Sequence, residues 1–261
     1  MHFFVIKSKT IKYLAIIFCC MLLLSVPVLG FNGKGMAQVF FAYSSNRKIP
    51  IYCVDRFDKK ISISFDASWG SDKTESILKV LRDTNTQANF FLVGMWVDKN
   101  EDLVKKMDSQ GIEIGTHSNL HPDMAKLSAK QQKLELTTSV EKLEKITGKK
   151  VNLFRAPFGS YNNTLLETCE ELNLKTIQWS VDTLDWKGLS GEEITKRVLK
   201  QTKSGSIILC HNNAMHILEA LPVIIQNLKS RGYEFVTISN LLLTGNTKVD
   251  NSGKQVKVWV L

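Results

Sequence analysis

The chain has 261 residues, 44% of them hydrophobic, and a formal net charge of +9. This length and composition suit one domain with a substantial core. Apart from the adjacent Cys19 and Cys20 near the N-terminus, the cysteines have no CxxC or paired spacing, which argues against a zinc knot or a disulfide framework. A basic surface can serve nucleic acid, an anionic membrane or an anionic cell-wall polymer.

The N-terminus has the pattern of an export segment. Three lysines precede an uncharged apolar run over residues 13–29, which is at the short edge of the length that a membrane-spanning helix needs. We therefore predict that residues 1–30 are a signal peptide or a membrane anchor outside the fold, with cleavage and retention both open. Export makes nucleic acid a poor candidate partner and favours a membrane or a cell-wall polysaccharide.

From residue 61 onwards, strand-like and helix-like segments alternate. Apolar residues recur at helical spacing at Ile77, Leu78 and Leu81, and Gly148 is typical of a residue that ends a helix. Strands are expected at 61–66, 88–94, 112–118, 153–159, 176–182, 206–211 and 234–239, and helices at 71–85, 97–110, 128–147, 162–172, 191–201 and 214–230.

This order predicts a single α/β domain over residues 61–242. Strands that alternate with helices form right-handed βα units around a parallel sheet, and seven such strands approach a closed barrel of the (β/α) type. We expect residues 31–60 to be a linker and an edge strand, and residues 243–261 to be a C-terminal tail. The sequence shows no internal repeat and no low-complexity tract.

Ionisable residues stand at the ends of five of the expected strands. Because the carboxyl ends of parallel strands meet at one edge of a sheet, and sites of α/β proteins are built there, this pattern predicts a polar site at one mouth of the barrel. The residues are Asp66, His117, Arg155, Asp182 with Asp185 just beyond it, and His211.

His117 and His121 are four residues apart and are candidate metal ligands. If the segment turns helically, both imidazoles share a face, which is the beginning of a transition-metal site. A catalytic zinc needs three protein ligands and an open position, and its bound water then has a pKa of about 7. Two histidines leave one ligand to be supplied by a carboxylate, and Ala67 cannot supply it.

The remaining strand ends suggest acid–base chemistry. His211 has a side chain of near-neutral pKa and suits a general acid, and either Asp182 or Asp185 could orient it and keep it charged. Arg155 could pair with Asp66 and hold that carboxylate ionised.

Apolar residues complete the expected site. The stretch around Phe158 and Gly159 is a tight turn whose backbone N–H groups could face a developing oxyanion. Trp186 and Leu209 could form an apolar wall beside the ionisable groups, although plain core packing would explain them equally well. Cys210 falls inside a strand-like run and is expected to be a small buried residue.

Taken together, these residues resemble the motifs of the polysaccharide deacetylase family, the NodB-homology carbohydrate esterases. The resemblance covers essentially the whole domain, with all five family motifs in order over residues 61–211. The stretch PIYCVDRFDKKISISFDASWG and the short N-terminal anchor look most like the sporulation-associated branch of the family. The five motifs correspond to SFDASWG, HSNLH, RAPFGSYN, DTLDW and IILCH.

The resemblance implies a distorted (β/α)7 barrel that removes N-acetyl groups from amino sugars of the N-acetylglucosamine or N-acetylmuramic acid type. It implies a divalent metal (zinc, cobalt or nickel), a peptidoglycan or chitin-like substrate, and an exported protein at the membrane, the cell wall or the spore envelope. We expect a monomer. By position, the implied metal ligands are His117 and His121, and the implied catalytic residues are Asp66 as general base with its partner Arg155, and His211 as general acid tuned by Asp185. The implied substrate contacts are the Phe158 N–H at the oxyanion, with Trp186 and Leu209 lining the acetyl pocket.

Ala67 departs from the family pattern, which has the third metal ligand at this position. Asp66 could rotate onto the metal and be compromised as a base, the metal could be held weakly, or the cleft could bind glycan without efficient turnover. The main interpretation is a slow or narrowly specific deacetylase. The alternatives are a glycan-binding protein of the spore envelope and, less favoured, an esterase of O-acetyl groups.

Overall fold

The computed structural model describes residues 47–258, so the predicted export segment lies outside the described residues. A compact unit begins at Lys48 and contains all the helices and strands discussed below. Within residues 47–258, every helix is too short or too polar to cross a bilayer.

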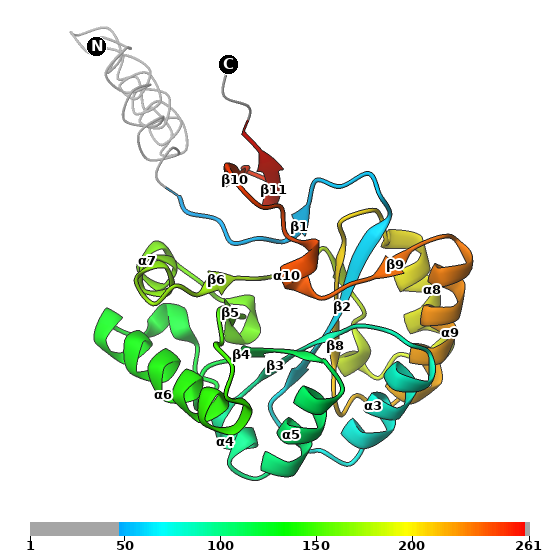
Figure 1. Ribbon diagram of the computed structural model, residues 1–261, viewed down its shortest axis with the longest axis horizontal. Helices are drawn as coiled ribbons and strands as arrows, with labels where there is room; N and C mark the ends of the chain where they lie inside the picture. Colours follow the sequence, from blue (N-terminus) through cyan, green and yellow to red (C-terminus); the bar gives the residue numbers. More distant parts are fainter. Residues whose placement is uncertain (1–46, 259–261) are drawn as a thin grey trace, which may run out of the picture. The chain divides into compact units, whose positions relative to one another are not determined.

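The core of this unit is a parallel eight-stranded sheet, as the alternation of strands and helices predicts (Figure 1). β2 (Lys60–Ala67) and β8 (Ile207–His211) pair with each other near its middle. The strand order is β6-β5-β4-β3-β2-β8-β7, with β9 also pairing with β2. The other strands are β3 (Asn89–Leu92), β4 (Glu113–Thr116), β5 (Leu153–Phe154), β6 (Lys175–Thr176), β7 (Val181–Asp182) and β9 (Glu234–Phe235).

The segment 176–182, predicted as one strand, instead forms the ends of two strands at opposite ends of the sheet. Ile177 donates its N–H to the carbonyl of Phe154 on β5 at 2.8 Å, whereas Ser180 donates to that of Ile207 on β8 at 3.0 Å. The link between β6 and β7 therefore joins the two ends of the sheet and curls it into the distorted (β/α)7 barrel that the family resemblance implies.

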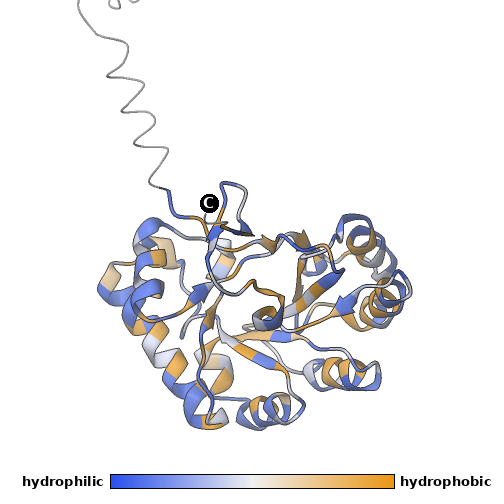
Figure 2. Cartoon of the chain, turned by 45° about the horizontal axis from the view of Figure 1, so that its top comes forward, coloured by the Kyte–Doolittle hydropathy of each residue, from blue (hydrophilic) through white to orange (hydrophobic). Residues whose placement is uncertain are grey.

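Helices surround the curled sheet in Figure 1. Figure 2 shows that they carry both hydrophobic and hydrophilic stretches, as helices with one buried face do. Gly148 ends α6 with a φ of 67°, which confirms its predicted role as a stop. The helix expected at 97–110 begins only at Glu101, as α5, and a separate one-turn helix, α4, precedes it. The helices are α3 (Thr74–Asp83), α4 (Gly94–Val97), α5 (Glu101–Ser109), α6 (Ala129–Thr147), α7 (Asn163–Glu171), α8 (Gly191–Gln201), α9 (Ile217–Ser230) and α10 (Ile238–Leu241).

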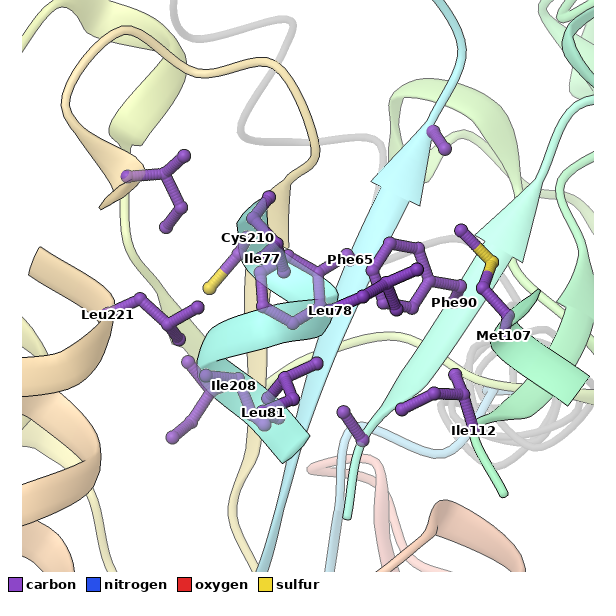
Figure 3. Packing of buried hydrophobic residues seen from close by; sticks show 14 of the residues in the cluster. Phe65, Ile77, Leu78, Leu81, Phe90, Met107, Ile112, Ile208, Cys210 and Leu221 are labelled. Carbon is purple, nitrogen blue, oxygen red and sulfur yellow. The ribbon is translucent and has the colours of Figure 1, made fainter. Parts of the chain in front are cut away.

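The alternation of side chains along β2 separates the hydrophobic core from the site. Phe65 stacks on Phe90 of β3 with ring centroids 4.8 Å apart, and Figure 3 shows both rings beside apolar side chains of α3. Ala67 is fully buried in the same apolar cluster. Successive strand residues point to opposite faces, so Ser64 and Asp66 face away from this cluster.

The C-terminal residues, expected to form a tail, contain two further strands. β10 (Thr247–Val249) and β11 (Lys254–Lys257) form an antiparallel pair. β11 also pairs in parallel with β1 (Cys53–Val54), so the beginning and the end of the described chain lie side by side in a second, three-stranded sheet (Figure 1).

Candidate active site

A cavity of about 920 Å³ lies at the carboxyl ends of the parallel strands. Every residue proposed from the sequence lines it except Arg155, which is buried behind Asp66. The expectation that these groups meet at one mouth of the barrel therefore agrees with the structure. The lining includes Asp66, His117, His121, Phe158, Asp185, Trp186, Leu209 and His211.

Asp66 and Arg155 form a buried ion pair. Arg155 is 0% exposed, and its Nη1 donates to Asp66 Oδ1 at 2.7 Å. Its other guanidinium nitrogens point to the backbone carbonyls of Ile177 and Gln178 at 3.4 and 3.3 Å. Burial opposes ionisation of Asp66, but the charge of Arg155 outweighs it and holds the pKa of Asp66 below its usual value. Asp66 is therefore an ionised carboxylate at neutral pH.

His117 presents one ring nitrogen to Asp66 and uses the other for orientation. Its Nδ1 lies 2.8 Å from the Arg155 carbonyl oxygen, which can only accept, so Nδ1 carries the proton. Nε2 is then unprotonated and lies 3.5 Å from Asp66 Oδ2. Burial lowers the pKa of His117, and burial followed by the charge of His117 lowers that of His121 to about 4. Both rings are neutral at pH 7, the form that binds metals.

The turn between the two histidines is not helical, so the condition under which both imidazoles would share a helix face is not met. Ser118 and His121 both have left-handed backbones, with φ of 70° and 61°. Glu135 of α6 accepts the N–H groups of Asn119 and Leu120 at 2.9 and 2.8 Å, in place of helical backbone hydrogen bonds. The imidazoles nevertheless meet, with ring centroids 4.9 Å apart.

The side chains present do not form a complete metal centre. Within residues 47–258, no group of three His, Cys, Asp or Glu side chains is placed to hold an ion. Asp66 has one oxygen bound to Arg155, and Ala67 contributes only a buried methyl group. A metal site built on His117 and His121 would therefore have only two of the three protein ligands that a catalytic zinc requires.

His211 is held by Asp185, which decides between the two aspartates considered from the sequence. The Nδ1 of His211 lies 2.7 Å from Asp185 Oδ1, and its backbone N–H donates to Oδ2 at 2.8 Å. Asp182 instead accepts the N–H of Leu184 at 2.8 Å. Burial lowers the pKa of His211, but the hydrogen bond to Asp185 outweighs burial and raises it. The protonated ring can act as a general acid.

We expect Asp185→Asn to lower the pKa of His211, because the substitution removes the carboxylate that favours the charged ring. The raised pKa stabilises the fold fully below the unfolded-state value near 6.5, and this contribution is lost as the pH rises through the folded-state pKa. The variant should therefore lose more stability at pH 5.5 than at pH 9. NMR titration of the His211 ring and urea unfolding at both pH values measure this; an unchanged titration would contradict the assignment.

The turn after β5 places Phe158 at the cavity. Gly159 and Ser160 donate their N–H groups to the carbonyls of Ala156 and Pro157, both at 3.0 Å, so we expect the Phe158 N–H to be the one that faces an oxyanion. Trp186 and Leu209 line the same cavity. Cys210 is buried, as expected, and burial raises the pKa of its thiol.

The cavity also contains residues that the sequence argument missed, because it followed titratable groups. Trp69 stands three residues after Asp66, close enough to the strand end to have been considered. Neither Trp179 nor Met215 follows a titratable strand-end residue directly. The additional lining residues include Trp69, Lys73, Trp179, Asn213 and Met215.

Comparison with known proteins identifies the family. The family model described as polysaccharide deacetylase matches residues 54–177. A peptidoglycan-N-acetylglucosamine deacetylase of Bacillus cereus is 33% identical over 193 residues, which cover 72% of this chain and 70% of the relative. The chain belongs to the polysaccharide deacetylase family.

Two further similar proteins carry different descriptions. The uncharacterized protein YlxY of Bacillus subtilis is 33% identical over 74% of this chain, which spans only 60% of the length of YlxY. A crystal structure of a CE4 family pseudoenzyme from Bacillus anthracis is 32% identical, with a TM-score of 0.71 over 74% of this chain and 68% of that one. A mutant of the same pseudoenzyme is described as having restored enzymatic activity.

Proposed function

We propose that this protein hydrolyses N-acetyl groups of cell-wall amino sugars, of the N-acetylglucosamine or N-acetylmuramic acid type. The observation that carries the proposal is the pair of dyads, Asp66 with Arg155 and His211 with Asp185, which present a carboxylate and an imidazole to one cavity. A carboxylate base beside an imidazolium acid is the arrangement that amide hydrolysis needs. Relatives named as peptidoglycan deacetylases support the substrate class.

The residues of the cavity act one after another in the proposed reaction. Asp66 takes a proton from a water molecule while the oxygen of that water forms a bond to the acetyl carbonyl carbon. The Phe158 N–H stabilises the oxyanion, and Trp186 with Leu209 holds the methyl group. The protonated ring of His211 then gives its proton to the nitrogen as the C–N bond breaks, which leaves acetate and a free amine.

Turnover is proposed to be slow because Ala67 leaves the metal centre without its third ligand. A water molecule bound to a complete centre would have a pKa of about 7, far below the pKa of bulk water. Asp66 therefore faces a poorer nucleophile than it would beside a three-ligand site. We propose that any divalent ion at His117 and His121 is held weakly.

A second candidate, binding of glycan without turnover, is favoured by the same residue. Ala67 removes a metal ligand while the cavity and both dyads remain. The Bacillus anthracis relative described as a pseudoenzyme makes this a realistic outcome for the family. We place either activity outside the cytoplasm, on a chain exported by its N-terminal segment and acting at the cell wall or the spore envelope.

Acetate release from chitotetraose and from peptidoglycan tests the proposal. We expect Asp66→Asn and His211→Ala each to reduce the rate by at least about a hundredfold, since each removes one proton-transfer group. His216→Ala is the matched control, because His216 pairs with exposed Glu219 at the start of α9 and should leave the rate unchanged.

The outcomes separate the two candidate functions. Release that survives both substitutions would refute the roles of Asp66 and His211. Binding of chitotetraose by the unmodified protein, with no acetate released over days, would favour the glycan-binding protein instead of the deacetylase.

A further inference from the structure

One wall of the cavity consists of three aromatic rings from separate loops. The ring of His121 contacts the rings of Trp69 and Phe158, and both centroid distances are 4.7 Å. Both contacts are edge-to-face, with interplanar angles of 71° for Trp69 and 72° for Phe158. Trp69 is 58% exposed and Phe158 is 67% exposed, so both present apolar surface to solvent at the cavity. Exposed apolar surface gathered in one cavity marks an interaction site more often than isolated exposed residues do.

The backbone holds this wall in place. His121 and Phe158 both have left-handed backbones, with φ of 61° and 59°. This conformation is unfavourable for residues other than glycine, so the surrounding structure has to hold it. The residue after Trp69 is anchored as well, because the carbonyl of Gly70 accepts from Trp96 Nε1 at 2.7 Å and from Asn212 Nδ2 at 2.9 Å. The rings are therefore positioned before any ligand arrives, which reduces the ordering cost of binding.

Contacts with other aromatic rings orient His121. Its Nδ1 is buried and has no hydrogen-bond partner among the described residues, in contrast to that of His117. The contacts from Trp69 and Phe158 supply the orientation that a hydrogen bond supplies for His117. The exposed rings of Trp69 and Phe158 would consequently form a fixed surface beside Asp66 and His117.

We infer that Trp69 and Phe158 form a stacking surface for a pyranose ring of the glycan, an inference that rests on the proposed function. The C–H groups on one face of a pyranose make an apolar surface that fits a flat aromatic ring, whereas its hydroxyl groups remain in water. Burying this face against Trp69 removes apolar surface of both partners from water. The surface adjoins Asp66 and His117 in the cavity, so it would bring the acetamide of the polymer to the catalytic dyads.

Calorimetric titration of the full-length protein with chitotetraose tests this inference independently of catalysis. We expect Trp69→Ala to weaken binding by about three- to tenfold, in line with the energy of one aromatic contact. Trp69→Tyr should restore most of the affinity, because it keeps a flat ring. Phe57→Ala is the matched control, since Phe57 is 90% exposed in the loop before β2, at the opposite end of that strand from Asp66.

Acetate release by the same proteins keeps the two proposals distinguishable. Circular dichroism first checks that Trp69→Ala is folded. If the folded variant binds chitotetraose as tightly as the unmodified protein, the stacking surface is refuted whether or not acetate is released. If Trp69→Ala weakens binding and Trp69→Tyr restores it while no protein releases acetate, the stacking surface stands and the deacetylase proposal fails.

Discussion

Replacing Ala67 with aspartate is expected to add a third ligand to the metal site proposed at His117 and His121 and to increase acetate release. The family resemblance implies a third ligand at this position, and because Ala67 packs in the apolar cluster, the new carboxylate has to turn at the end of β2 to reach His117 and His121. The increase should be at least the roughly 10- to 100-fold change that follows loss of a partner supporting a metal ligand, since position 67 would contribute a direct ligand. Acetate release with added zinc or cobalt, and the metal content of the purified protein, measure the two effects.

The same substitution should make stability depend on metal. Ala67 is buried in the apolar cluster with Phe65, so an aspartate there pays a desolvation penalty in the absence of an ion. An ion that binds only the folded variant would offset this loss and raise the melting temperature with its concentration. Ala67→Asn is the matched control, because it has nearly the same shape without the charge.

An Ala67→Asp variant that takes up no more metal than the unmodified protein would contradict this prediction. It would mean that the side chain at position 67 points into the apolar cluster and cannot turn towards the histidines. The low activity proposed for the chain would then need a cause other than the missing ligand.

Local patterns predicted most of the barrel. The helix expected at residues 191–201 has the same bounds in α8, because Ser190 and Glu193 form a capping box at its start. The strand predicted at residues 61–66 lies within β2. Such segments carry their own signals, in the period of their apolar residues and in the residues that cap them.

Features that depend on distant partners were not predictable. The division of residues 176–182 between β6 and β7 is set by hydrogen bonds to β5 and β8, which are remote in the sequence. The pairing of β11 with β1 joins residues about 200 positions apart and leaves no local signature. The turn after His117 is shaped by Glu135 of α6, so the four-residue spacing alone suggested the wrong local geometry.

The candidate site could be predicted as far as the strand ends determine it. Parallel strands bring Asp66, His117 and His211 to one edge whatever the loops do. The choice of Asp185 over Asp182 depended on the turn between them, where Leu184 has a φ of 53°. Trp69 was missed because, unlike Trp186 next to Asp185, it is not adjacent in the sequence to one of the titratable strand-end residues.

Replacing Arg155 with methionine is expected to lower the free energy of unfolding by about 3–5 kcal/mol at pH 7, because it leaves the Asp66 carboxylate buried without its counter-charge. The lowered pKa of Asp66 stabilises the fold above the unfolded-state pKa, near 3.9, and this contribution is lost as the pH falls through the folded-state value. The difference between the two proteins should therefore be larger at pH 7 than at pH 3. Urea unfolding at both values measures it.

The double variant Arg155→Met with Asp66→Asn identifies the cause of that loss. Removing the unpaired charge should recover a substantial part of the stability that Arg155→Met loses, so the two substitutions should be strongly non-additive. Arg155→Lys keeps the charge but cannot reach Asp66 and the carbonyls of Ile177 and Gln178 together. Its free energy of unfolding should therefore lie between those of the unmodified protein and Arg155→Met. If the double variant is no more stable than Arg155→Met alone, packing of the Arg155 guanidinium on the Phe91 ring, 4.1 Å away, is the greater contribution, and Asp66 does not depend on Arg155 for its charge.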